Sequence, residues 1–356
     1  MNINNLSLFI EINRFDLIFL VGENNKDINF KNIYKRKVKL EGFENNKISD
    51  LEKVFKIFKE NIFLIEEKFN FTFKEIILIL ENFNPMILNL TGFKKLNGSQ
   101  ILRENITYIL NTLKSCLDET ESKKNIIHIF NSKFLLDKKK IENLPIGLFG
   151  DFYSHELSFI LIDSNDYKNL ENIFQKCNLK IKKILLKSFI KGAFISNNNN
   201  NIDTFFQIQI NENNSKIFYF ENNSLKFEQI FKFGTDIIVK DISKITSLKI
   251  DTVKKILDKV QLHEEIRNDD FIEEDFFKNE FNKKIKKKLV YEIALARIKE
   301  ISEIILYENI NLKYLANSNK KIFLEICENF RSHSVNQILS AIFSQKNSQV
   351  QLFNNL

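Results

Sequence analysis

A plan of secondary structure that occurs twice along the chain constrains the fold most. In the first copy, apolar alternation predicts a hairpin of two strands (6–12 and 15–22), a third strand (36–40), a helix (about 50–69) and a further strand (75–80). In the second copy, three strands are expected at 204–210, 216–221 and 227–233, and the first helix at 237–246. The repeat of about 200 residues indicates a duplication, because hairpin, strand, helix and strand recur in the same order.

The segment between the two copies follows a different pattern. It predicts strands at 85–91, 125–130, 156–163 and 181–185 and helices at 100–116, 166–177 and 188–194. A loop is predicted at 141–150. The asparagine run at 197–201 predicts a polar surface loop. The second copy continues with a second helix at 251–260 and a long helix that ends near residue 308. It closes with a strand at 321–326, a helix at 335–343 and a strand at 349–353.

Composition excludes several classes of protein. The chain has 356 residues, of which 44% are hydrophobic and 28% charged, so it can bury a core. It contains no apolar run of membrane-spanning length and no secretory start. Three distant cysteines (Cys116, Cys177, Cys327) cannot build a disulfide framework, so we expect a cytosolic protein. The net charge of +7 is spread over 53 basic and 46 acidic residues, and we therefore expect no nucleic-acid partner.

Three stretches of the sequence form a recognisable set. They are a Pro145-x-Gly147-x-x-Gly150 loop before a strand, Gly234 followed by Asp241-Ile242, and a long helix carrying Arg297 and Glu300. Together they resemble bacterial cell-division proteins of the FtsA family, in the actin-like ATPase superfamily. Their order and spacing hold from about residue 8 to residue 353. The resemblance implies an α/β fold of duplicated actin-like (ribonuclease H-like) halves, with a small α+β domain inserted in the first half.

The family layout implies four parts. The first actin-like subdomain is expected at 1–82 plus 164–200, with the FtsA-type small domain inserted at 83–163. The second actin-like subdomain is expected at 201–258 plus 316–356, and a helical partner-binding subdomain at 259–315. The family comparison also implies a shortened C-terminus that lacks the usual amphipathic anchor. We therefore expect only an indirect or weak membrane contact, at the cytoplasmic face of the inner membrane at the division site.

Departures from the family concentrate at the nucleotide site. Actin-like ATPases hold phosphate in glycine-rich turns whose backbone N–H groups approach the anion. The first turn here reads Glu11-Ile12-Asn13-Arg14, which keeps an acid for Mg²⁺ but loses the glycine and hydroxyl. The second reads Gln209-Ile210-Asn211-Glu212-Asn213-Asn214, and Lys216 replaces a further acid. At the third element Ile326-Cys327 stands where two glycines are expected.

These losses predict a degenerate nucleotide site, formed by Glu11, Asn13, Arg14, Gln209, Asn211 and Lys216. We expect no required cofactor and no hydrolysis, so the protein is not predicted to be an enzyme. An alternative is a nucleotide-binding ATPase that retains Mg·ATP through Glu11, Arg14 and Lys216, with Arg14 and Lys216 meeting phosphates in a different geometry. The four histidines are scattered without metal-ligand spacing.

The resemblance implies one partner site. Arg297 and Glu300 project from one face of the long helix, in the subdomain that binds the C-terminal peptide of FtsZ in the family. Arg297 would meet a peptide carboxylate, while the alternative is a surface ion pair. The expected function is a division-ring scaffold that binds FtsZ and other division proteins and self-associates into actin-like filaments. A second alternative is an actin-like scaffold of pilus assembly.

Overall fold

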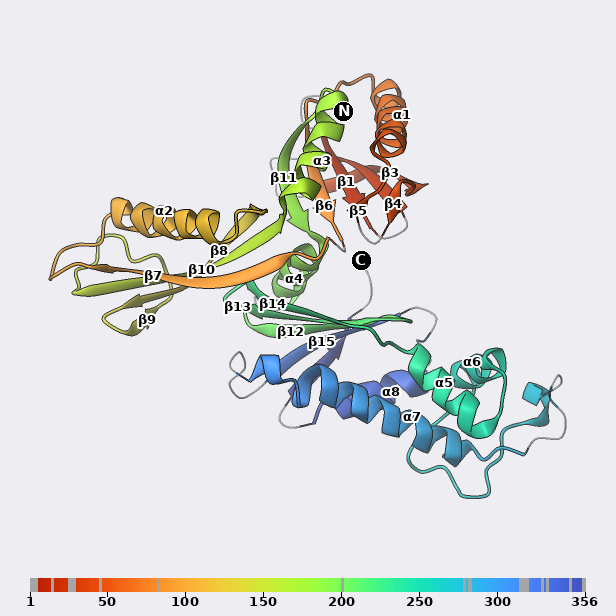
Figure 1. Cartoon of the computed structure of the whole chain (residues 1–356). Helices are drawn as coiled ribbons and strands as arrows, with labels where there is room; N and C mark the ends of the chain where they lie inside the picture. The colour runs from red at the N-terminus through yellow and green to blue at the C-terminus, as the bar shows by residue number, and fades with distance from the viewer. Residues whose placement is uncertain are drawn as a thin grey trace. The chain divides into compact units, whose positions relative to one another are not determined.

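The computed structural model describes residues 6–13, 16–24, 30–44, 47–81, 83–199, 202–277, 280, 284–313, 320–327, 330, 333–345 and 348–353 (Figure 1). The chain divides into two compact units, Met1–Phe194 and Ile195–Leu356. Each unit is built around its own five-stranded sheet.

The sheet of the first unit has the strand order β11-β6-β1-β2-β3. Its strands are β1 (Leu6–Ile12), β2 (Asp16–Asn24), β3 (Phe30–Lys39), β6 (Glu75–Leu80) and β11 (Lys180–Leu186). β1, β2 and β3 are antiparallel, whereas β6 runs parallel to both β1 and β11. Because parallel neighbours need crossover connections, the two crossovers carry helices: α1 (Leu51–Phe69) and α3 (Ser164–Lys176).

Both crossover helices cover the same face of this sheet. The ring of Phe58 in α1 lies 6.0 Å from Phe19 of β2 and 5.0 Å from Phe174 of α3. α1 begins where the Asp50 side chain accepts a hydrogen bond from the Lys53 backbone N–H, and ends at Asn70 in the left-handed conformation. A short hairpin of β4 (Phe43–Glu44) and β5 (Lys47–Ile48) precedes α1.

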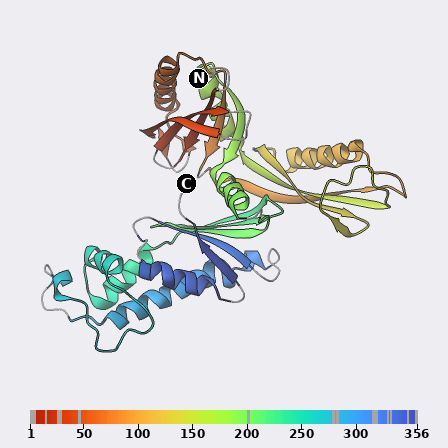
Figure 2. The ribbon, with the colours of Figure 1, turned by 180° about the vertical axis from the view of Figure 1, so that it is seen from behind.

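An antiparallel sheet is inserted between β6 and α3. Its order is β7-β10-β8-β9, formed by β7 (Met86–Lys95), β8 (Lys124–Leu136), β9 (Lys139–Ile141) and β10 (Phe152–Asp163). Figures 1 and 2 show α2 (Arg103–Thr120) lying along one face of it. The approach is close at Gly92, where a Cβ would stand 2.4 Å from Cγ2 of Ile109.

The second unit repeats the topology of the first sheet. Its order is β14-β13-β12-β15-β16, with β12 (Phe205–Ile210), β13 (Ser215–Glu221), β14 (Ser224–Phe231), β15 (Lys320–Ile326) and β16 (Ser348–Leu352). Helices pack one face of it into a large apolar core: α5 (Asp236–Thr246), α6 (Ile250–Lys259), α7 (Lys287–Ser302) and α8 (His333–Phe343). In both sheets three antiparallel strands precede two parallel ones, which confirms the predicted duplication.

Local differences from the sequence expectations have simple causes. Asn197 and Asn198 were predicted in a loop, but α4 (Lys187–Asn198) continues through them, because tertiary packing of Ile195 outweighs their weak helix propensity. The long helix α7 ends at Ser302 and passes into a π-helical turn at Glu303–Tyr307. The short strands β4, β5 and β9 were missed, since two or three residues carry no periodicity.

Candidate functional site

Three charged residues meet where the parallel strands of the first sheet end. Glu11 is the last residue but one of β1, Glu81 directly follows β6, and Lys187 directly follows β11. The Lys187 ammonium donates to Glu11 Oε1 at 2.5 Å and lies 3.5 Å from Glu81 Oε2. We call these residues the carboxyl-edge triad; this edge is where open α/β sheets usually bind ligands.

The triad contains its own cation, which offsets one of its two carboxylate charges. Glu11 is only 8% exposed, so an uncompensated charge there would be costly. Burial lowers the pKa of Lys187, but the carboxylates of Glu81 and Glu11 outweigh it and the net pKa is raised. The ammonium therefore stays charged and lies between the two carboxylates. Sequence analysis had singled out Glu11 but neither Glu81 nor Lys187.

The first turn uses its described N–H groups internally. The Asn13 backbone N–H donates to the Asp16 carbonyl at 3.1 Å, and the Asn13 side-chain oxygen accepts from the Asp16 backbone N–H at 2.7 Å. An asparagine side chain thus takes the donor that a phosphate-binding turn would offer to an anion. Arg14, the proposed alternative phosphate contact, lies outside the described residues.

The second turn presents carbonyl groups to the helix that follows the sheet. The carbonyls of Asn211 and Glu212 accept from the N–H groups of Thr235 and Asp236, each at 3.0 Å. The Asn211 N–H bonds the Asn214 carbonyl at 2.9 Å. A Cβ on Gly234 would stand 2.1 Å from the Asn211 carbonyl oxygen, so glycine permits this close contact. The start of α5 is therefore capped by the turn itself, rather than left open for an anion.

Side chains around the second turn are also paired. Glu212 forms an ion pair of 2.8 Å with Lys254 of α6, which holds its carboxylate at the rim of the turn. The third element lies beside the turn: the Cys327 N–H donates to the Ile210 carbonyl at 3.0 Å, and its sulfur lies 3.5 Å from the Thr235 hydroxyl. The second and third predicted elements are therefore brought together in this unit.

A carboxylate that sequence analysis missed stands beside Gln209. The Gln209 amide donates to Glu325 Oε2 of β15 at 3.0 Å, and both side chains are buried. Lys216 is the antiparallel partner of Gln209 on β13 and is also buried. Glu325 is the last residue but one of the strand predicted at 321–326. A lone charged residue in a buried strand was the available signal.

Arg297 is engaged within its own unit. Its guanidinium donates through Nε to Asp241 of α5 and through a terminal nitrogen to Glu300 at 2.6 Å. These two bonds use two of the five N–H donors of the group, so donors remain for a further carboxylate. Arg297 and Glu300 do lie together as expected, whereas the role of Asp241 as a partner was not foreseen. Lys288, at the start of α7, bonds the Asn268 side chain at 2.8 Å.

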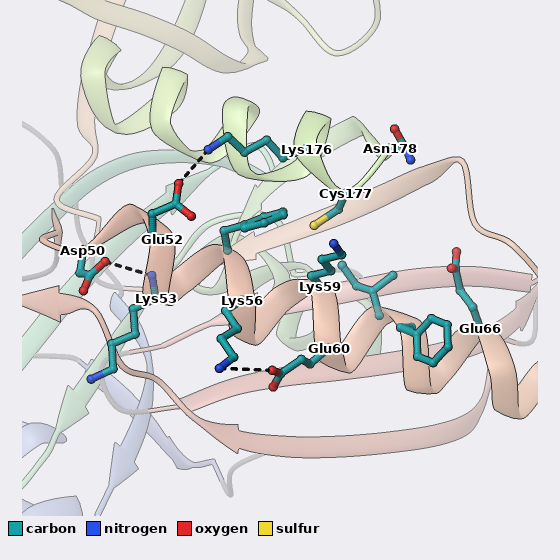
Figure 3. Close-up of a pocket in the computed structure, with 13 residues that line it drawn as sticks. Asp50, Glu52, Lys53, Lys56, Lys59, Glu60, Glu66, Lys176, Cys177 and Asn178 are labelled. Atoms are coloured by element: carbon teal, nitrogen blue, oxygen red, sulfur yellow. Dashed lines mark hydrogen bonds and ion pairs between the residues drawn. The ribbon is translucent and has the colours of Figure 1, made fainter.

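A cavity of about 890 Å³ lies on the outer side of α1 and the end of α3 (Figure 3). Phe55, Ile62 and Phe63 supply apolar lining, and the rim alternates acids with lysines, including the Glu52–Lys176 pair at 3.1 Å. Burial raises the pKa of the Cys177 thiol to about 11, so this thiol is protonated at neutral pH. The cavity offers no activated nucleophile, and the rim is balanced in charge.

The duplicated sheets and the inserted small sheet define an actin-like fold. Among solved structures, the chain resembles a protein of the PilM–PilN type IV pilus biogenesis complex, with a TM-score of 0.53 and 7% sequence identity. That likeness covers 98% of this chain and 90% of the other, and it concerns the fold alone. The predicted actin-like fold is therefore confirmed.

The sequence is similar to that of the cell division protein FtsA. FtsA of Buchnera aphidicola subsp. Schizaphis graminum is 21% identical over 247 residues, covering 69% of this chain and 59% of that protein. FtsA of Neisseria meningitidis serogroup B is 21% identical over 227 residues, covering 62% and 53%. The resemblance to FtsA is confirmed, although no family model matches the chain. The chain spans about three fifths of the length of the Buchnera relatives it matches.

Among the residues that the structure describes, none of the helices has both the length and the apolar character needed to cross a bilayer.

Proposed function

We propose that this protein is a bacterial cell-division scaffold that works by binding, without nucleotide turnover. The sequence similarity to FtsA supports the division role. In this proposal the protein acts at the cytoplasmic face of the inner membrane at the division site. It binds the C-terminal peptide of FtsZ, contacts other division proteins and self-associates through its actin-like fold.

One observation carries the proposal that nucleotide is dispensable. Lys187 lies between Glu11 and Glu81, at 2.5 and 3.5 Å, and so supplies the positive charge that Mg²⁺ would bring to these carboxylates. The internal bonding of the Asn13 turn and of the Asn211 turn supports the same conclusion, because the backbone N–H groups of Asn13, Asp16 and Asn211 already have acceptors. The Lys187 ammonium is part of the chain and is always present, whereas Mg²⁺ would be present only when nucleotide is bound.

The proposed FtsZ site is the exposed side of α7 around Arg297. Asp241 and Glu300 hold the guanidinium in one orientation, and its remaining donors can form a charge-assisted bond to a peptide carboxylate. The two acids also lower the local positive potential. We therefore expect modest affinity, in the micromolar range of about 8 kcal/mol.

A peptide of the FtsZ C-terminal tail, titrated into the protein by calorimetry, tests this site. Wild type is expected to bind, and Arg297→Glu is expected to weaken binding by about tenfold or more. Lys288→Ala is the matched control on the same helix, and its affinity should barely change. Equal affinities for wild type and Arg297→Glu would remove the assignment. Loss of binding in the control as well would point to a general charge effect.

A nucleotide-dependent ATPase remains the alternative that the Glu11 carboxylate allows. It requires Mg·ATP to compete with Lys187 for Glu11 and Glu81. The likeness to the pilus protein concerns the fold and does not favour a pilus function over a division function.

A further inference from the structure

One stripe of α1 lines the cavity between that helix and the end of α3 (Figure 3). Phe55, Lys59, Ile62 and Phe63 follow one another at intervals that place them on one side of the helix. Phe63 is 63% exposed and Phe55 is half-buried, whereas Ile62 is 3% exposed and belongs to the core. The cavity therefore has an apolar lining that solvent can reach.

The end of α3 forms the other wall of the cavity and brings a second ammonium group to it. The Nζ atoms of Lys59 and Lys176 lie 5.7 and 5.5 Å from the centroid of the Phe55 ring. Both distances are within the range of cation–π attraction. The neighbouring Cys177 thiol is half-buried and neutral at physiological pH, so it extends the apolar lining. Apolar surface and positive charge thus meet at Phe55.

The lysines around the cavity differ in how their charge is balanced. Lys53, Lys56 and Lys176 each pair with a glutamate, at 3.0, 4.0 and 3.1 Å. Lys59 lies over the Phe55 ring and has no carboxylate within ion-pair distance among the residues that the structure describes. Lys59 is therefore the lining cation that can meet an anionic ligand without breaking an ion pair of the chain.

Size and charge together define the class of ligand. The volume of about 890 Å³ is in the range of small-molecule pockets, roughly 300–1,000 Å³. The lining carries four acids, which oppose a second negative charge on the ligand: Asp50, Glu52, Glu60 and Glu66. The complement of this lining is a molecule with an apolar body and one negative charge.

We propose that this cavity binds a small amphiphilic carboxylate, of the class of medium-chain fatty acids. Its carboxylate would accept from Nζ of Lys59, and its chain would lie over Phe55, Ile62 and Phe63. Phe55 and Phe63 are two helical turns apart, roughly 12 Å along α1, a span that a decanoate chain can cover. The cavity shares no residue with the carboxyl-edge triad or the proposed FtsZ site, so the inference does not rest on the proposed function.

Isothermal titration of the full chain with three probes tests the ligand class. Decanoate should bind saturably at one site. Decyltrimethylammonium has the same apolar chain with the opposite charge and should bind at least about tenfold more weakly. Acetate has the head group without the chain and should show no binding. Equal affinity for the two amphiphiles, or the lack of saturable decanoate binding, would overturn the proposal.

Substitutions at exposed positions of α1 test the charged contact. Lys59→Gln should weaken decanoate binding by about tenfold or more and remove the preference over decyltrimethylammonium. Lys56→Gln is the matched control one turn away, because Lys56 is already paired with Glu60. Its affinity for decanoate should stay close to that of wild type. A preference for decanoate that survives in Lys59→Gln would place the charged contact elsewhere and overturn the assignment.

A second pair of variants tests the apolar contact. Phe63→Ser should weaken decanoate binding several-fold, because part of the apolar lining is lost. Leu64→Ser is the control: Leu64 is 42% exposed on the same helix but does not line the cavity. Equal losses in the two variants would contradict binding along this stripe.

The cysteines report where decanoate binds. Saturating decanoate should slow alkylation of Cys177, followed by mass spectrometry at mildly alkaline pH. Alkylation of Cys116, which is exposed on α2, should continue at its original rate. Protection of Cys177 alone would locate the ligand in the cavity. Equal protection of both cysteines would indicate detergent-like binding to the whole surface and would overturn the proposal, as would the lack of protection of Cys177.

Discussion

Lys187 donates a hydrogen bond of 2.5 Å to Glu11, although the two residues are 176 positions apart in the chain. The contact joins the ends of β1 and β11, on either side of β6. It places an ammonium group beside two carboxylates at the edge where the parallel strands end. In the function proposed above, this ammonium takes the place of a cation that a nucleotide would bring.

Removal of the ammonium should create a demand for another cation. Lys187→Ala leaves Glu11 and Glu81 facing each other and should destabilise the first unit by about 1–3 kcal/mol. Millimolar Mn²⁺ should restore part of the melting temperature of the variant and leave wild type unchanged. Thermal melts with and without Mn²⁺ measure this. Equal shifts in the two proteins would contradict the assigned role, and Lys180→Ala, at an exposed lysine of β11, serves as the control.

A buried histidine should make the inserted domain sensitive to acid. His155 is 1% exposed, both ring nitrogens lack a described partner, and burial lowers its pKa to about 4 from 6.5. Between pH 6.5 and about 4 the unfolded chain binds a proton that the folded chain does not. Stability is therefore complete above pH 6.5 and falls by up to about 3 kcal/mol toward pH 4.

The variant His155→Leu isolates this effect. Its loss of stability between neutral pH and a pH of about 4.5 should be smaller than that of wild type, measured by urea unfolding followed by circular dichroism. His263→Leu, at an exposed histidine of the second unit, should behave like wild type. If His155→Leu keeps the wild-type pH dependence, His155 does not titrate as stated.

The second turn should be intolerant of any side chain at its contact with α5. Gly234→Ala would place a Cβ 2.1 Å from the Asn211 carbonyl oxygen, and a backbone atom cannot move aside cheaply. We expect a loss of about 1–3 kcal/mol of stability and detachment of the turn from α5. Hydrogen exchange of the Thr235 and Asp236 amides should accelerate. At Gly98 a Cβ would meet only the far end of Asp151, at 3.9 Å, but its positive φ makes it a poor control.

A better control for the turn is a neighbouring polar residue. Asn213→Ala changes the same turn without altering the contact with α5, so its melting temperature should stay close to wild type. A protein with Gly234→Ala that melts like Asn213→Ala would show that the turn is not packed against α5.

The order of the elements was accessible from the sequence because each strand and helix has its own periodicity. β1 and β6 were predicted at Leu6–Ile12 and Glu75–Leu80, and the structure has these bounds. In each of these strands the apolar residues are contiguous in the sequence, so the pattern can be read locally. The edge strand β3 is longer than expected, because its residues before Arg36 show no regular alternation of apolar and polar side chains.

The contacts of the site were not accessible in the same way. Glu11 was identified from its turn, but its partner Lys187 is brought to it only by the parallel pairing of β1, β6 and β11. The Gln209–Glu325 and Arg297–Asp241 contacts likewise join strands or helices distant in sequence. A charged residue directly after a buried parallel strand is a usable signal, since such strands end at one edge.

Isothermal titration of the full chain with Mg·ATP tests whether the protein works without nucleotide. We predict no binding to wild type up to about millimolar nucleotide, which corresponds to a binding free energy weaker than about 4 kcal/mol. The FtsZ-tail peptide, titrated into the same preparation, shows that the protein is competent to bind. Micromolar binding of Mg·ATP to wild type would contradict the account, because nucleotide would then displace Lys187 from Glu11.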